Sequence, residues 1–235
     1  MTATPGKKQQ VEEMFDNIAP TYDRLNHLLS MQVDRTWRRK VVRMAAKNAP
    51  REILDVATGT GDLAISLARK IAGSQVVGID ISEGMLEIGR RKVAERGLGE
   101  RVILQAGDAE ALDFADGRFD SVTAAFGVRN FGDIGAGLRE MYRVTRPGGE
   151  CLVLEFSEPT VPLFGWAYRI YFHMVLPKMG RAISKNNGAY AYLPESVTGF
   201  PAPDVFAEMM REAGFSEVSE RRLTFGVAYI YTARK

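Results

Sequence analysis

The stretch Asp55-Val-Ala-Thr-Gly-Thr-Gly-Asp62 decides the fold, because it joins a short apolar run to a segment with helical periodicity. The run Glu52–Ala57 has the length and the β-branched content of a buried strand. The segment Asp62–Ile71 repeats apolar residues at the spacing of one helix face. A strand, then Gly59-x-Gly61-x-x-Ala, then a helix is the arrangement in which a ligand approaches the backbone beside a helix N-terminus.

The same alternation continues outward from this loop and predicts a parallel sheet covered by helices on both faces. Two closing runs, Glu217–Thr224 and Val227–Ala233, are separated only by Phe225-Gly226, which predicts an antiparallel hairpin. The fold class is therefore α/β, with a mostly parallel seven-stranded sheet and an antiparallel last strand. The further strands and helices are expected at Gln75–Asp80, Arg101–Gln105, Phe119–Ala125 and Gly149–Phe156, and at Ser82–Arg96, opened by Ser82 as N-cap, and Asp133–Thr145.

The two ends of the chain depart from this alternation. Residues Val11–Ala46 predict two or three extra N-terminal helices, interrupted at Pro20 and again around Ser30–Asp34. Near the other end, a helix is expected at Asp204–Ala213, closed by Gly214. We expect one domain with four segments: a helical cap or flap at 1–48, a ligand-binding core at 49–158, an apolar substrate-side insertion at 159–203, and a helix and hairpin at 204–235 that complete the domain.

Composition excludes several functional classes. The 235 residues are 46% hydrophobic and 26% charged, with 31 basic against 29 acidic side chains. A net charge of +2 does not indicate nucleic acid as a partner. The single cysteine, Cys151, cannot form an internal disulfide, and His27 and His173 lack metal-ligand spacing. No signal peptide or apolar span is apparent, so we expect a cytoplasmic protein without a metal.

The charges beside the glycine loop indicate what it binds. Asp55 ends the strand and Asp62 lies in the first helical turn, so both would repel a pyrophosphate. The same carboxylates suit a ligand whose charged centres are a sulfonium and an ammonium, which favours a methyl donor over a dinucleotide. In the alternative interpretation, Asp62 only caps the helix and Asp55 accepts a hydrogen bond from a loop N–H.

Two later aspartates extend the predicted ligand site. Asp80 ends the second strand, where a carboxylate accepts both hydrogens of a ribose diol. Asp108 and the backbone of Ala109 follow the third strand, where they could hold the exocyclic amine and a ring nitrogen of adenine. The alternative for Asp108 is an N-cap for a short turn at Ala109–Leu112.

Several longer motifs resemble one enzyme family across nearly the whole chain. These are Phe15-Asp-Asn-Ile-Ala-Pro-Thr-Tyr22-Asp23, Ala125-Phe-Gly-Val-Arg129-Asn130, Tyr142-Arg-Val-Thr-Arg-Pro-Gly-Gly149 and Leu154-Glu-Phe-Ser157. They are similar to the demethylmenaquinone and 2-polyprenyl-benzoquinol C-methyltransferases. The resemblance implies a class I methyltransferase Rossmann-like fold and methyl transfer from S-adenosyl-L-methionine, leaving S-adenosyl-L-homocysteine, to a ring carbon of a prenylated hydroquinone.

The resemblance also implies which residues contact the donor. Family contacts fall on positions matching Thr60, Asp80, Asp108 and Ala109. Ala125 matches a serine of some members, and without a hydroxyl it contributes only its backbone. Together with Asp55, Gly59 and Gly61 of the loop, these residues form the predicted donor site.

Catalytic candidates follow the fourth predicted strand and the first motif. Methylating a ring carbon requires an ionised hydroquinone oxygen, which Arg129 could stabilise electrostatically and Asn130 could bind as a donor. Tyr22 and Asp23 would lie on a flap that closes over the donor and excludes water. The alternatives are an ion pair between Arg129 and a neighbouring acid such as Asp133, and a Tyr22 packed in the core.

Two segments indicate contact with lipid. Val161–Pro177 is apolar and aromatic apart from Arg169 and His173, which suits a cavity for a prenyl tail with His173 as a candidate base. Its alternatives are plain core and a homodimer interface. The helix expected at Asp34–Lys47 carries a basic face that could contact the inner face of a membrane, although basic faces are commonly just solvated. That face comprises Arg35, Arg39, Arg43 and Lys47.

The resulting prediction is C-methylation of demethylmenaquinol, on the likeness of Phe200-Pro201 to the menaquinone members. A 2-polyprenyl-6-methoxy-benzoquinol acceptor and another small-molecule methyltransferase remain open. So do a non-catalytic donor-binding module and a dinucleotide oxidoreductase.

Overall fold

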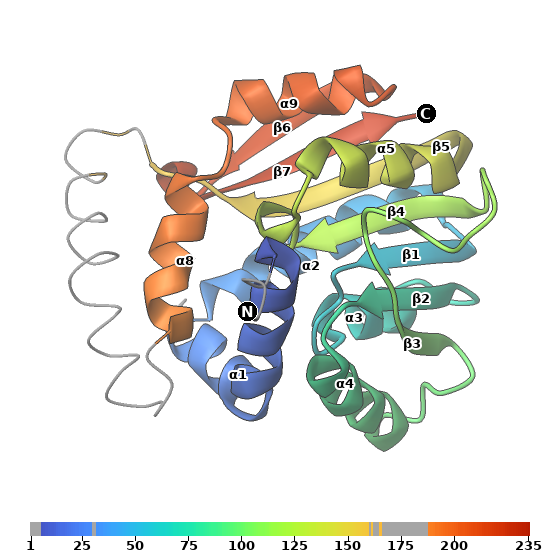
Figure 1. The fold of residues 1–235 in the computed structure, drawn as a ribbon. Coiled ribbons are helices and arrows are strands. Elements are labelled where there is room, and N and C mark those ends of the chain that lie inside the picture. Colours follow the sequence, from blue (N-terminus) through green and yellow to red (C-terminus); the bar gives the residue numbers. More distant parts are fainter. Residues whose placement is uncertain (1–5, 30–31, 160, 162–164, 166–187) are drawn as a thin grey trace.

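One sheet of seven strands, in the order β3-β2-β1-β4-β5-β7-β6, forms the centre of the protein (Figure 1). The computed structural model describes residues 6–29, 32–159, 161, 165 and 188–235. The five strands expected before residue 157 all form, which confirms the alternation predicted from the sequence. The strands are β1 (Glu52–Val56), β2 (Gln75–Asp80), β3 (Val102–Ala106), β4 (Phe119–Ala125), β5 (Thr145–Phe156), β6 (Ser216–Leu223) and β7 (Ala228–Arg234).

Strand directions also agree with the prediction. β1 pairs in parallel with β2 and β4, while β3 and β5 extend the sheet in parallel on either side. β7 lies antiparallel between β5 and β6, so the last strand alone is reversed. The predicted two-residue turn is wrong, because Leu223 pairs with Ala228 and leaves a four-residue connection. Thr224, Phe225 and Gly226 of this connection have positive φ angles.

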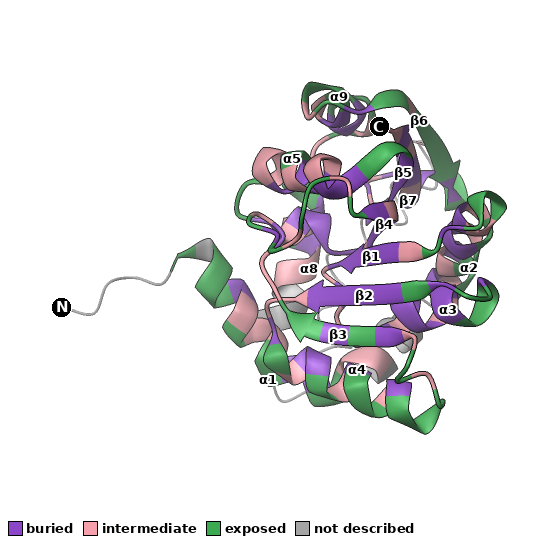
Figure 2. Cartoon of the chain, turned by 90° about the vertical axis from the view of Figure 1, so that its right-hand side faces the viewer, coloured by how far each residue is buried: buried purple, intermediate pink, exposed green. Residues whose placement is uncertain are grey.

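Helices cover both faces of the sheet, and their apolar stripes form two clusters of buried side chains (Figure 2). One face packs against α2 (Val33–Ala45), α3 (Asp62–Lys70) and α4 (Glu83–Glu95). The other packs against α5 (Ile134–Val144) and α9 (Pro203–Glu212). Ser82 caps α4 by accepting a hydrogen bond from the Met85 N–H at 3.2 Å, as the sequence predicted. The short 3-10 turns are η1 (Ala46–Asn48), η2 (Val128–Asn130) and η4 (Thr224–Gly226).

The N-terminal helix α1 runs unbroken over Lys7–Leu29 with Pro20 inside it, so the predicted interruption at Pro20 is wrong. Proline removes one helical N–H bond, and contacts on its N-terminal side compensate for the loss. Ile18 is buried against Met85 of α4. The Asp16 carboxylate accepts hydrogen bonds from Ser82 Oγ at 2.6 Å and from the Gly84 N–H at 3.0 Å.

The chain reverses its direction of sheet growth between β1 and β4, and this fixes where a ligand can bind. After β1 the chain adds β2 and then β3 on one side, whereas β4 and β5 lie on the other. Ligands of open α/β sheets bind at the carboxyl ends of strands beside such a reversal. In Figure 1 the arrowheads of β1, β2 and β4 point toward α1, which lies at this edge with α8 (Gly188–Thr198).

The apolar stretch that the sequence assigns to a prenyl tail lies largely outside the described residues. Residues 166–177 of the apolar stretch, including Arg169 and His173, lie outside the described residues, so the prediction for His173 stays a prediction. In the part of the chain that the structure describes, no helix has the length and apolar character that a membrane span requires.

The core makes one testable prediction through Tyr231 of β7. Its side chain is fully buried beside Phe206, and within the described residues its hydroxyl is the one buried side-chain polar atom without a hydrogen-bond partner. An unsatisfied buried hydroxyl costs roughly 1–3 kcal/mol. Tyr231→Phe should therefore raise the free energy of unfolding in urea by about 1 kcal/mol or more. The half-buried neighbour provides the control, since Tyr229→Phe should change it by less than about 0.5 kcal/mol; a destabilised Tyr231→Phe would contradict the prediction.

Candidate functional site

A cavity opens at the carboxyl edge of the sheet, where sheet growth reverses between β1 and β4. Its empty volume, which includes open solvent at the mouth, is about 990 Å³. The loops after β1, β2, β3 and β4 form its walls, and α1 and α2 cover it. The residues predicted from the sequence that line it are Tyr22, Asp55, Gly59, Thr60, Asp80, Asp108, Ala109, Ala125 and Asn130.

The glycine loop brings its backbone to the wall of this cavity. Gly59 and Gly61 have φ angles of +55° and +77°, which residues with a Cβ rarely adopt. A Cβ on Gly61 would also lie 3.0 Å from Leu104 Cδ1. Gly61 itself is not on the cavity wall but forms the N-cap of α3. The loop therefore needs both glycines, one for the wall and one for the entry into the helix.

Asp55 supports the glycine loop through hydrogen bonds to two threonine hydroxyls. Its buried carboxylate accepts hydrogen bonds from Thr58 Oγ1 at 2.6 Å and from Thr123 Oγ1 of β4 at 2.8 Å. Burial raises the pKa of the Asp55 carboxyl to about 6, although the threonine hydrogen bonds and the nearby Arg38 charge act in the opposite direction. The alternative expected a backbone N–H from the loop; a backbone hydrogen bond does reach Asp55, from Ala64 of α3, beside the two hydroxyl groups.

Asp80 and Asp108 stand further along the same edge. Asp80 accepts the Gly59 N–H at 2.8 Å on one oxygen and the Ser82 N–H at 3.0 Å on the other, and burial raises the pKa of its carboxyl. An ionised carboxylate has about four acceptor sites, so further hydrogen bonds to a diol fit. Partial burial opposes ionisation of Asp108, but Lys8 and the Glu110 N–H outweigh it and lower its pKa.

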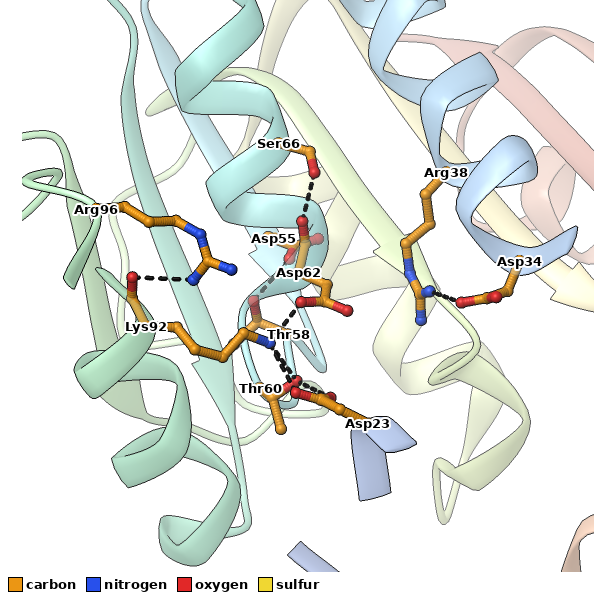
Figure 3. Close-up of polar contacts among 10 residues, drawn as sticks. All are labelled: Asp23, Asp34, Arg38, Asp55, Thr58, Thr60, Asp62, Ser66, Lys92 and Arg96. Atoms are coloured by element: carbon orange, nitrogen blue, oxygen red, sulfur yellow. Dashed lines mark hydrogen bonds and ion pairs between the residues drawn. The ribbon is translucent and has the colours of Figure 1, made fainter. Parts of the chain in front are cut away.

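Four side chains, which we term the Lys92 cluster, connect the N-terminal helix α1 to the glycine loop: Asp23, Thr60, Asp62 and Lys92 (Figure 3). Thr60 Oγ1 donates to Asp23 Oδ1 at 2.6 Å, and the Lys92 ammonium lies 2.9 Å from Asp23 Oδ2. Lys92 also pairs with Asp62. Gly61 rather than Asp62 is the N-cap of α3, so the capping alternative for Asp62 is wrong. No local pattern in the sequence indicates Lys92, which lies on α4 and reaches the loop only in the folded chain.

A second cation missed by the sequence analysis, Arg38 of α2, lines the cavity directly. Its guanidinium pairs with the buried Asp34 one turn earlier and lies 5.2 Å from the centre of the Phe126 ring. In Figure 3 Arg38 and Asp34 lie on the opposite side of the view from Lys92. The basic face predicted for this helix did not include Arg38, because Arg38 lies on the side of α2 that faces the cavity.

The side chains of Arg129 and Asn130, which follow β4, point in different directions. Asn130 lines the cavity, and its Oδ1 accepts a hydrogen bond from the Tyr192 hydroxyl of α8 at 3.1 Å. Arg129 is not among the cavity-lining residues, which corrects the expectation of a direct contact with a developing oxyanion. Its guanidinium turns to Glu155 Oε1 at 3.0 Å and to the Phe126 carbonyl, because Glu155 is a fully buried acid that requires a cation. The expected alternative partner, Asp133, instead caps α5 through the Ala136 N–H.

The charge of the lining limits the class of ligand. Six carboxylates line the cavity, against the cations Lys8 and Arg38. A diphosphate would meet this excess of negative charge, whereas a nucleoside with a cationic centre would be attracted. Among the described residues, no group of three His, Cys, Asp or Glu side chains could hold a metal ion. The carboxylates are Asp23, Asp55, Asp62, Asp80, Asp108 and Glu110.

Comparisons with known sequences agree with this geometry. The model of the ubiE/COQ5 methyltransferase family matches residues 3–235. A demethylmenaquinone methyltransferase of Thermus thermophilus is 55% identical over 218 residues, which cover 93% of this chain and 98% of the relative. The corresponding Bacteroides fragilis protein is 48% identical over 229 residues, 97% and 94% of the two chains. The ubiquinone/menaquinone biosynthesis C-methyltransferase UbiE of Geobacter sulfurreducens is 47% identical over 230 residues, 97% and 90% of the two chains.

Solved structures share the fold at low sequence identity. A SAM-dependent methyltransferase from Aquifex aeolicus has a TM-score of 0.61 at 18% identity, over 83% of this chain and 88% of the other. The cyclase SpnF has a TM-score of 0.69 at 19% identity, over 99% and 97%. Since these two proteins carry different descriptions, their likeness shows the fold and not the reaction.

Asp55 makes a pH-dependent prediction. Because its folded-state pKa of about 6 lies above the unfolded value of about 4, the folded state binds more protons between these values. Its contribution to stability therefore falls as pH rises through that window and is constant above it. In urea titrations, the free energy of unfolding of Asp55→Asn minus that of the unchanged protein should increase by roughly 2 kcal/mol from pH 4 to pH 6.5. A difference independent of pH would contradict this assignment.

Proposed function

The chain belongs to the ubiE/COQ5 methyltransferase family, and from that membership we propose that it is an S-adenosyl-L-methionine-dependent C-methyltransferase that converts demethylmenaquinol to menaquinol. The observation that carries this proposal is the acid-lined cavity with Asn130 at its wall, at the reversal point of the sheet. Relatives 48–55% identical to the chain carry the name demethylmenaquinone methyltransferase. The name of the Geobacter sulfurreducens relative includes ubiquinone as well, which makes a benzoquinol the second candidate acceptor.

Donor binding is assigned to the residues along β1, β2 and β3. The Asp80 carboxylate binds the ribose diol, and Asp108 with the Ala109 backbone binds the adenine edge. Thr60 and Gly59 of the loop contact the amino-acid end of the donor, beside Ala125 at the carboxyl end of β4. When bound, the donor supplies an electrophilic methyl group on a positively charged sulfur.

Activation of the quinol acceptor is assigned to Asn130, with Tyr22 lining the same cavity from α1. A ring carbon becomes nucleophilic when the neighbouring hydroquinone oxygen is ionised. Because the Tyr192 hydroxyl donates to Asn130 Oδ1, the Asn130 NH₂ is left to donate toward the cavity and to stabilise that oxygen. Arg129 acts as a positioning residue, since its bonds to the Phe126 carbonyl and to Glu155 hold the turn that presents Asn130.

The helix α1 excludes water from the reacting groups. Val11, Phe15 and Tyr22 line the cavity from this helix, and the Lys92 cluster fixes it against the glycine loop. Removing water strengthens every electrostatic interaction inside the site. Release of the products requires α1 to move, because it covers the ligand edge of the sheet (Figure 1).

The acceptor is tested by competition between two quinols. The protein is incubated with methyl-labelled donor and equal amounts of a demethylated naphthoquinol and a demethylated benzoquinol, both kept reduced. We expect label chiefly in the naphthoquinol, and none when the same rings are supplied as oxidised quinones, which have no ionisable ring hydroxyl. Label in neither quinol, with binding of S-adenosyl-L-homocysteine intact, would contradict the proposed acceptor. In the same assay, Asn130→Ala should lower kcat by roughly 100-fold and leave that binding unchanged.

We further propose that the protein contacts anionic lipid through α2, at the membrane in which a prenylated quinol resides. Arg35, Arg39, Arg43 and Lys47 are all exposed, and they follow one another at the spacing of one helix face. Trp37 and Val41 of the same helix are buried against the sheet, so the basic residues point outward. A basic residue near an anionic surface contributes about 1 kcal/mol.

Vesicle flotation tests this contact. Binding to vesicles containing anionic lipid should fall with added salt, and R35Q/R39Q/R43Q should weaken it by roughly 100-fold, as expected for three lost cations. The matched control R69Q/K70Q/R91Q removes the same charge from exposed residues elsewhere and should bind nearly as the unchanged protein does. Equal loss in both triple variants would show that net charge, not α2, governs binding.

A further inference from the structure

The proposed donor carries a carboxylate, for which the acidic residues of the cavity lining provide no counter-charge. Besides its cationic sulfur and its ammonium, it carries an α-carboxylate, and this inference rests on that proposed donor. A carboxylate placed among six others is repelled unless a cation pairs with it in a site largely shielded from water. The chain must therefore supply a cation at the end of the cavity that receives the amino-acid group.

Among the described residues, Lys8 and Arg38 are the cations on the cavity wall, and Lys92 and Arg129 lie beside it, with Arg129 paired to Glu155. Lys8 pairs with Asp108 after β3, at the end assigned to adenine. Lys92 is shared between Asp23 and Asp62 and is not on the cavity wall. Arg38 lines the wall and lies against Phe126, which directly follows β4. Because β3 and β4 are separated by β2 and β1 in the sheet, Arg38 and Lys8 mark opposite ends of the cavity.

Arg38 is held rigidly enough to recognise a planar anion. Asp34, whose side chain is only 4% exposed, pairs with its Nη1 from one helical turn away. The Phe126 ring supports the guanidinium face at 5.2 Å. A guanidinium has five N–H donors in a fixed plane, so pairing through Nη1 leaves donors for a second carboxylate. Arg38 and Asp55 both line the cavity, so the guanidinium shares one cavity with the glycine loop.

We propose that Arg38 binds the α-carboxylate of the methyl donor, and that Asp34 and Phe126 hold the guanidinium in the orientation this contact needs. Arg38 then selects donors that retain the carboxylate over decarboxylated ones. It also fixes the amino-acid end opposite the adenine, so that the sulfur between them stands near Ala125 and faces the Asn130 side of the cavity.

Equilibrium binding to three matched ligands tests the assignment without any turnover. S-adenosylhomocysteine carries the carboxylate and the amine, decarboxylated S-adenosylhomocysteine carries the amine alone, and 5′-methylthioadenosine carries neither. Arg38→Met should raise the Kd of S-adenosylhomocysteine by roughly 30-fold, the size of a charge-assisted hydrogen-bonded contact. The Kd values of the other two ligands should change by less than about threefold. Arg38→Lys, which keeps the charge but loses the planar fork, should give an intermediate loss of roughly fivefold.

Controls separate this role from a structural one. Arg35→Met, on the exposed face of the same helix, should leave all three Kd values unchanged. If Arg38→Met does not fold, as judged by its thermal unfolding, Arg38→Lys carries the comparison. An equal weakening of all three ligands by the Arg38 variants would overturn the proposal, as would Lys92→Met alone abolishing the preference for the carboxylate.

The outcome is distinguishable from failure of the proposed function. Carboxylate-selective binding through Arg38, together with no methylation of either quinol, would refute the proposed acceptor and leave this assignment intact. No binding of S-adenosylhomocysteine by the unchanged protein would refute both.

Discussion

The buried Asp55 carboxylate is the constraint on which the site depends. It accepts one hydroxyl from Thr58 in the loop after β1 and another from Thr123 in the adjacent strand β4, and so ties the glycine loop to β4. Because the Gly59 N–H also donates to Asp80 at the end of β2, the loop is held from the strands on both sides of β1. The geometry of the cavity therefore follows from one unusually placed acid, whose burial is compensated by two hydroxyl groups.

Charge is distributed along this edge in an order that matches a small zwitterionic nucleoside. Asp108 and Asp80 stand at the β3 and β2 ends, Asp62 and the Lys92 cluster stand over the helix entry, and Arg38 stands at the β4 end. Two of these groups also hold α1, because Asp23 and Lys8 belong to this helix and pair with Lys92 and Asp108. Residues of the cavity wall thus take part in fixing the position of α1.

Much of the fold could be predicted from the sequence, because strands and helices leave periodic patterns. The runs around Asp55 and Phe119 have the apolar character of strands buried on both faces, and the closing hairpin follows from its short connection. Pro20 was misinterpreted, since tertiary contacts of Asp16 and Ile18 outweigh the loss of one helical hydrogen bond. Asp55 and Asp80 were placed at the cavity by their positions at predicted strand ends, whereas Thr60, Ala109 and Ala125 came from the family resemblance. Arg38 and Lys92 were not predicted, because each acts through partners or neighbours distant in sequence.

Arg129 illustrates why position along a strand does not determine the direction of a side chain. It follows β4 at the ligand edge, yet the buried acid Glu155 on the neighbouring strand draws its guanidinium away from the cavity. Only Asn130, one residue later, reaches the wall. The division of labour between these two residues, one positioning and one facing the acceptor, needs the three-dimensional partner of the arginine to be known.

The central claim is that methyl transfer goes to a ring carbon of a quinol. It is tested most directly by supplying donor with a deuterated methyl group and a demethylated naphthoquinol, then oxidising the product and examining it by mass spectrometry. A methyl group on carbon survives as a labelled quinone, because both ring oxygens remain free to be oxidised. We expect that labelled quinone. A labelled product that resists oxidation to the quinone would place the methyl group on oxygen and contradict it.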